Sequence, residues 1–138
     1  MRNPLNEKGL KTRREVLGDE YVDRALKNAD DFTWAMQELV TDICWDGIWN
    51  RPGLDRKTRS LINIAMLMAL GKPHELKAHI IGARNNGASD TEIQEVLLQG
   101  AVYCGVPAGV DAFRVAKETK MGTDLFSDAG DNSQDAKK

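Results

Sequence analysis

The sequence predicts an all-α protein. From residue 31 to 120 apolar residues recur at the three- and four-residue intervals of helices, and no stretch alternates as a half-buried strand does. Proline and glycine interrupt this pattern where helices should end. Ser89 followed three residues later by Glu92 is the capping box that marks a helix start.

Length and charge exclude several classes of function. The 138 residues suit one domain. A formal net charge of -2 without a basic cluster argues against nucleic-acid binding. No apolar segment approaches the roughly 20 residues of a membrane span, and residues 1–16 lack the apolar core of a signal peptide. We therefore expect a soluble, cytoplasmic protein that binds neither nucleic acid nor membrane.

The first 30 residues predict two short helices. Residues 10–18 form a short amphipathic segment that Gly18 should close, and Asp19 should cap the next helix, over 19–29. Helices this short are marginal in water unless they pack on something larger. The expected parts of this single domain are an N-terminal helical arm over 1–30, a helical core over 31–121 and a flexible tail over 122–138.

Two longer helices should follow. The first, over 31–49, has one apolar stripe: Phe32, Met36, Leu39, Val40, Ile43 and Gly47. Pro52-Gly53 then breaks the chain, and Asp55 should cap a helix over 56–70. This second helix is apolar on every side from Leu61 onward. It therefore belongs at the centre of the fold or in a subunit interface.

The next helix, over 73–85, contains both histidines of the chain. Pro73 suits a first helical position, and Asn85-Asn86-Gly87 suits a helix end. Glu75 and His79 are four residues apart, so their side chains should share one face, with the carboxylate orienting the imidazole.

The last two helices should pack closely. A helix beginning after Ser89 has an apolar stripe of Ile93, Val96, Leu97, Gly100, Ala101 and Cys104. After Gly105-Val106-Pro107, a helix over 108–120 should pack through Val110 or Gly109, Phe113 and Ala116-Lys117. Small residues along both helices would allow the backbones to approach each other.

The residues suited to chemistry each have a plain structural alternative. The candidates are His79, Glu75, Arg59, Tyr103, Cys104, Trp45 and Trp49, with Arg51 as a weaker anion binder. Glu75 would also stabilise a helix dipole, Arg59 would also pair with Asp55, and the tryptophans would also form a packed aromatic edge. His74 should face solvent.

The sequence gives little support to a catalytic metal site or to a reaction at a thiol. Glu75 and His79 offer two ligands, whereas a catalytic zinc takes three from the protein. Cys44 and Cys104 form no CxxC pair and are expected to be reduced thiols.

Residues 45–118 closely resemble the carboxymuconolactone decarboxylase family. The shared motifs are RPGLD-R-x-TRSL, HEL-x-x-H, NNG, EI-x-EVL and YCGVPA, and their combination is much more specific than any one of them. Alkylhydroperoxidase-D-like proteins of the same superfamily have a CxxC pair before the family histidine. Here those two positions are Lys72 and Glu75, which argues against peroxide reduction because that chemistry needs two thiols.

The resemblance implies an alkylhydroperoxidase-D-like helical bundle that assembles as a homohexamer and uses no cofactor. It implies conversion of 4-carboxymuconolactone to 3-oxoadipate enol-lactone and CO2, in the protocatechuate branch of the β-ketoadipate pathway. His79 matches the family histidine and is the expected catalytic residue. From their chemistry, Glu75 should favour the imidazolium form, and Arg59 should bind a substrate carboxylate.

Weaker expectations and other functions remain open. Tyr103, or a backbone N–H near Gly105, would donate to an oxyanion, and Trp45 and Trp49 would wall the pocket. The alternatives are a related lactone or β-keto acid decarboxylase or isomerase, a non-catalytic helical oligomer that binds an acidic metabolite, and a thiol-dependent reductase.

Overall fold

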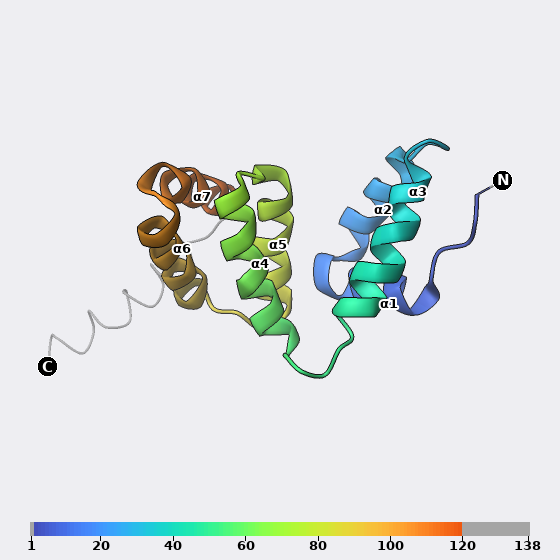
Figure 1. The fold of residues 1–138 in the computed structure, drawn as a ribbon, viewed down its shortest axis with the longest axis horizontal. Helices are drawn as coiled ribbons and strands as arrows, with labels where there is room; N and C mark the ends of the chain where they lie inside the picture. The colour runs from blue at the N-terminus through green and yellow to red at the C-terminus, as the bar shows by residue number, and fades with distance from the viewer. Residues whose placement is uncertain (1, 120–138) are drawn as a thin grey trace, which may run out of the picture. The chain divides into compact units, whose positions relative to one another are not determined.

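The structure is a computed structural model that describes residues 2–119. The predicted flexible tail over 122–138 lies outside these residues. Every regular element of the described chain is helical, which confirms the all-α prediction (Figure 1). The elements are α1 (Glu7–Leu17), α2 (Asp19–Asn28), α3 (Trp34–Leu39), η1 (Val40–Ile48), α4 (Arg56–Leu70), α5 (Pro73–Asn85), α6 (Asp90–Cys104) and α7 (Val106–Glu118). They divide into two compact units, an N-terminal one that ends at Arg59 and a C-terminal one that begins at Ser60.

In the N-terminal unit, α1 packs against η1 and α2. Helix α1 begins earlier than predicted because the Asn6 side chain accepts a hydrogen bond from Gly9 N, 2.9 Å away, and so caps it. It ends at Gly18, as predicted, in the left-handed region at φ 89°. Gly18 rather than Asp19 is the cap of α2. A Cβ at Gly9 would overlap the carbonyl oxygen of Thr41, so this position requires glycine.

The predicted single helix over 31–49 is wrong in its form and in its buried face. It is a short α-helix, α3, followed by the π-helix η1. The predicted core stripe is largely exposed at Phe32, Met36, Leu39 and Ile43. Thr41, Trp45 and Trp49 are buried instead. A π-helix bonds residues five apart, so the 3.6-residue period behind the prediction does not apply there.

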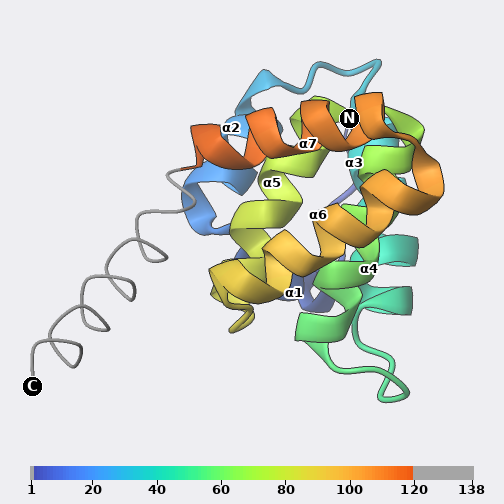
Figure 2. The ribbon, with the colours of Figure 1, turned by 90° about the vertical axis from the view of Figure 1, so that its left-hand side faces the viewer.

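In the C-terminal unit, α4 and α5 run in opposite directions around a turn at Gly71, whose φ is 67° (Figure 1). Helices α6 and α7 also run in opposite directions and pack against each other and against α5 (Figure 2). The four helices share one buried apolar cluster, comprising Ile64, Met68, Leu76, Ile80, Ala83, Ala88, Ile93, Leu97, Ala112, Val115 and Ala116.

Local signals located most of the helix starts from α4 onward. Asp55 caps α4 through a 2.7 Å bond from Thr58 N, α5 begins at Pro73, and the Ser89–Glu92 capping box is formed. Helix α7 begins at Val106, earlier than predicted, with Pro107 tolerated in its first turn.

The buried face of α7 is the predicted one in part. Gly109 and Ala116 are buried as predicted, and Ala112 is buried with them, whereas Val110 and Phe113 are exposed. A Cβ at Gly109 would overlap that of Ala101, so the predicted close approach of the last two helices is confirmed.

Much apolar surface of the C-terminal unit is left exposed. On α4, Ser60, Ile64 and Met68 are buried, whereas the opposite face is exposed at Ile62, Met66 and Leu70. Helices α6 and α7 expose a further set, made up of Leu98, Val102, Tyr103, Val106, Val110 and Phe113. Exposed apolar side chains on neighbouring helices are typical of an interaction site when they form one contiguous surface. None of the described helices has the length and apolar character that a membrane span requires.

Candidate active site

His79 lies on α5, and Asn63 of α4 is its neighbour. The two are in the C-terminal unit, with Asn63 Nδ2 3.4 Å from His79 Nδ1. An amide nitrogen can only donate, so in the neutral imidazole this contact makes Nδ1 the acceptor. The ring proton is then on Nε2, which leaves that edge of the ring as a hydrogen-bond donor.

Burial decides the charge of His79. Desolvation lowers the pKa of its imidazole from 6.5 to about 4, and the nearby Glu75 carboxylate raises this pKa by a smaller amount. At neutral pH the imidazole is therefore uncharged in the isolated chain. Glu75 favours the imidazolium form, as predicted, but burial outweighs the carboxylate.

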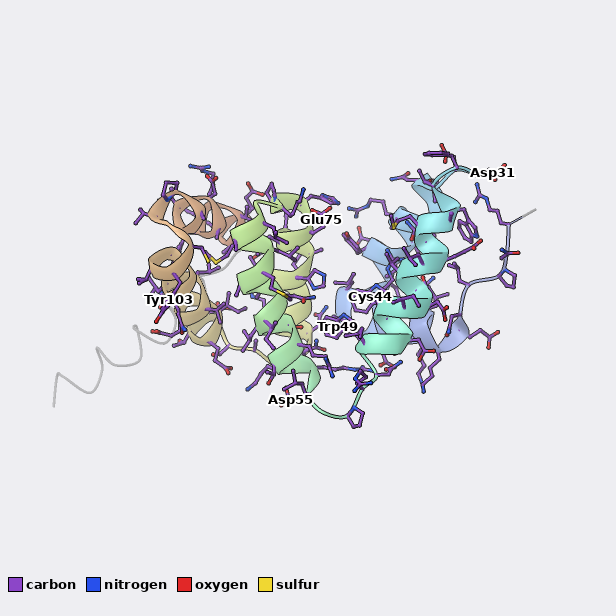
Figure 3. The ribbon with its side chains drawn as sticks, viewed as in Figure 1. Asp31, Cys44, Trp49, Asp55, Glu75 and Tyr103 are labelled. Carbon is purple, nitrogen blue, oxygen red and sulfur yellow. The ribbon has the colours of Figure 1, made fainter. Side chains whose placement is uncertain are left out.

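Glu75 lies in the first turn of α5, one turn before His79, and is exposed (Figure 3). Its electrostatic effect on the imidazole agrees with the predicted shared face. His74, at the same end of the helix, is exposed as predicted.

Arg59 is the last residue of the N-terminal unit, and the structure does not show the predicted ion pair between Arg59 and Asp55. Its Nη2 donates to the carbonyl oxygen of Arg51, 3.1 Å away, while the Asp55 carboxylate is engaged in capping α4. Arg59 Nε is buried and has no hydrogen-bond partner among residues 2–119. A guanidinium in this state retains the capacity to bind a carboxylate.

Trp45 and Trp49 form a packed aromatic pair in the N-terminal unit. Their rings stack with centroids 4.9 Å apart, and each side chain is 4% exposed. Near them in sequence, Cys44 is partly buried, and burial raises the pKa of its thiol. A protonated thiol is a poor nucleophile, which counts against thiol-dependent reduction at Cys44.

Tyr103 and Cys104 lie at the exposed end of α6. Tyr103 is 83% exposed, and Figure 3 shows it on a part of the C-terminal unit well separated from Glu75. The chain therefore does not bring Tyr103 together with the Glu75 end of α5. In the part of the chain that the structure describes, no group of three histidine, cysteine or acidic side chains could hold a metal ion.

Asn63 is the site residue that the sequence reasoning missed. It is the one polar residue in the otherwise apolar run over 61–70. A polar side chain within such a run needs a hydrogen-bond partner when it is buried. This interruption of the apolar pattern could have identified Asn63 as a partner for a nearby functional group.

Comparison with known proteins shows which family this chain belongs to. Residues 35–118 match the model of the carboxymuconolactone decarboxylase family. The chain is 46% identical to a nitrosuccinic acid decarboxylase of Metarhizium robertsii over 83% of its own length and 80% of the relative's. It is 40% identical to a 4-carboxymuconolactone decarboxylase of Acinetobacter baylyi over 90% and 88% of the two chains. The chain therefore belongs to the carboxymuconolactone decarboxylase family and is an enzyme of the decarboxylase class.

Proposed function

We propose that this enzyme decarboxylates 4-carboxymuconolactone to 3-oxoadipate enol-lactone without a cofactor, in cytoplasmic protocatechuate catabolism through the β-ketoadipate pathway. The observation that carries the proposal is His79, held as a neutral imidazole on α5 with Asn63 beside its Nδ1. The match to a 4-carboxymuconolactone decarboxylase along nine-tenths of the chain supports the choice of substrate.

The substrate can supply its own electron sink. Its leaving carboxylate sits on a ring carbon next to a carbon–carbon double bond that is conjugated to the lactone carbonyl. When the bond to CO2 breaks, the electron pair moves through the ring to the lactone oxygen as a dienolate. A proton then adds to the ring carbon next to the carbonyl. The protein has to bind the acid, stabilise the oxyanion and deliver this proton.

His79 delivers the proton in this proposal. A negatively charged substrate raises the pKa of a neighbouring imidazole, and Glu75 acts in the same direction. Substrate binding is therefore accompanied by uptake of a proton at His79. The imidazolium gives this proton to the ring carbon, and the neutral imidazole takes another from solvent when the next substrate binds.

The remaining site residues bind the substrate. Arg59 provides a planar, permanently charged fork for a carboxylate. Arg51, whose carbonyl oxygen accepts a bond from Arg59, contributes a second positive charge. The stacked Trp45 and Trp49 provide an apolar wall that strengthens each charged contact. Tyr103, which the chain does not bring to the Glu75 end of α5, is left out of this site.

A second candidate substrate is nitrosuccinic acid, which the 46% identical relative is named for. Loss of CO2 from the carbon that bears the nitro group moves the electron pair onto the nitro oxygens. The same carbon then takes up a proton. The demands on the protein are the same as for the lactone, since each reaction needs an anion site and a proton donor.

The experiment is CO2 release from both acids by wild type, His79→Gln and His74→Gln, with the fold of each checked by circular dichroism. We expect the higher kcat/KM with 4-carboxymuconolactone, a loss of about 10²–10⁴ in kcat for His79→Gln, and no loss for the exposed His74→Gln. Faster turnover of nitrosuccinic acid would favour the second candidate. Near-normal turnover by His79→Gln would remove this residue from the mechanism.

Arg59→Ala tests the anion site separately. Loss of a charge-assisted hydrogen bond of roughly 1.5–3 kcal/mol corresponds to a KM increase of about 10- to 150-fold, with a smaller change in kcat. An unchanged KM would show that another group binds the carboxylate.

Assembly as a homohexamer is part of the proposal. It is supported by the apolar faces that α4, α6 and α7 leave exposed, which a second copy of the chain would cover.

A further inference from the structure

Among residues 2–119, Arg13 of α1 is a buried cation without a carboxylate partner. Its side chain belongs to a residue that is 6% exposed, and none of the described residues forms an ion pair with it. The adjacent Arg14, in contrast, pairs with Asp19 and Asp23 at 3.2 and 2.8 Å. Asp90, the other buried charged residue of the described chain, pairs with Arg84 at 3.0 Å.

The surroundings of Arg13 within the N-terminal unit are polar but not anionic. Its Nη1 donates to Gln37 Oε1, 2.8 Å away, and its Nε is buried without a partner among residues 2–119. Desolvation lowers the pKa of Arg13, and it outweighs the phenol of Tyr21 and the thiol of Cys44, which raise this pKa. Because a guanidinium can only donate, this bond fixes the Gln37 amide with its oxygen toward Arg13 and leaves its NH2 group able to donate elsewhere.

A buried charge with no counterion costs far more than an apolar side chain of similar volume would at the same position. Arginine stays charged even when desolvation lowers its pKa. The folded chain therefore holds a desolvated cation that an anion would compensate. The unpartnered Nε and the amide of Gln37 provide donors for such an anion.

We propose that Arg13 is the centre of a carboxylate-binding site for the substrate, formed in the N-terminal unit with Gln37 as a second donor. Arg59 is the other arginine of this unit with a buried Nε and no partner for it. Two arginines left without carboxylates suit a ligand that carries two, and both candidate substrates are dicarboxylic acids. This choice of ligand class rests on the proposed function, and it makes Arg13 a determinant of specificity for diacids over monoacids.

The test uses succinate, an unreactive diacid, and butyrate, a monoacid of equal chain length. Binding to wild type, Arg13→Met and Arg14→Met is measured by calorimetry and by thermal unfolding. We expect succinate to bind and stabilise wild type and Arg14→Met, to bind Arg13→Met at least about tenfold more weakly, and to bind wild type more tightly than butyrate does. Without ligand, Arg13→Met should unfold no earlier than wild type, because it relieves an uncompensated charge.

Several outcomes would overturn the inference. Wild type that does not bind succinate, equal binding by wild type and Arg13→Met, or equal binding of succinate and butyrate would each do so. Loss of oligomer mass in Arg13→Met, measured by light scattering, would show instead that the counterion is a carboxylate of a second copy. If Arg13→Met does not fold, Arg13→Lys replaces it. It keeps the charge but loses the fork, so an unchanged succinate affinity in this variant would also be contrary to the proposal.

Succinate binding requires no decarboxylation, so the two proposals can fail separately. If the protein binds succinate through Arg13 but converts neither acid, the carboxylate site is supported and the proposed reaction is refuted. Turnover of 4-carboxymuconolactone with the same KM in Arg13→Met and wild type would refute the site and leave the reaction standing.

Discussion

Mild acid should destabilise this protein through His79. The pKa of the imidazole is about 4 in the folded chain, below its ordinary value of 6.5, because burial opposes the charge. Between these two values the unfolded chain binds the proton more readily than the folded one does. The stability associated with the neutral imidazole is therefore complete above pH 6.5 and is lost as the pH falls through 6.5 toward 4.

The size of the effect follows from the two pKa values. At about 1.4 kcal/mol per unit, the difference corresponds to ~3 kcal/mol over the whole window. Since the unfolded chain is almost fully protonated at this position by pH 5, about 2 kcal/mol should already be lost there. This is a large fraction of the 5–15 kcal/mol that is typical of a folded domain, taken as a rough range.

Urea unfolding followed by circular dichroism between pH 7 and pH 5 measures this loss. His79→Gln removes the titrating group and keeps a polar side chain of similar length. The free energy of unfolding of wild type should fall by about 2 kcal/mol more than that of His79→Gln over this range. His74→Gln, altered at an exposed position of the same helix, should follow wild type. Parallel pH profiles for wild type and His79→Gln would refute the argument that burial controls this imidazole.

Three further predictions concern packing and assembly. Gly109→Ala places a Cβ against Ala101 and should lower the free energy of unfolding by about 1–3 kcal/mol; the second change Ala101→Gly should restore part of it, and a strictly additive double variant would contradict the close contact. Ser89→Ala removes the capping box of α6 and should cost about 1 kcal/mol in chemical denaturation, whereas an unchanged midpoint would mean that the cap contributes nothing. Val102→Glu introduces a charge among the exposed apolar side chains of α6 and tests the proposed homohexamer: it should reduce the mass measured by light scattering, and an unaltered mass would mean that α6 is not part of the proposed interface.

The elements that could be predicted from sequence are those fixed by local chemistry. Pro73 at a helix start, the Ser89–Glu92 box and glycine at a helix end each act within a few residues, so their positions were found correctly. The form of η1 could not be found this way, because a π-helix is not distinguished from an α-helix by composition. Assuming a 3.6-residue period there assigned Ile43 to the core, although it is exposed.

In the candidate site, too, the features that depend on local spacing could be predicted, and those that depend on distant residues could not. The meeting of Glu75 and His79 depends only on helical spacing, and the carboxylate does raise the pKa of the imidazole. The net direction of the shift depends on burial by residues distant in sequence, which no local pattern encodes. Arg13 is the same kind of case, since its sequence neighbours do not indicate that it is buried without a carboxylate. The consequence is chemical: a bound anion stabilises the protonated form of His79 and compensates the Arg13 guanidinium, so the charge missing from the isolated chain is the charge that an acidic substrate carries.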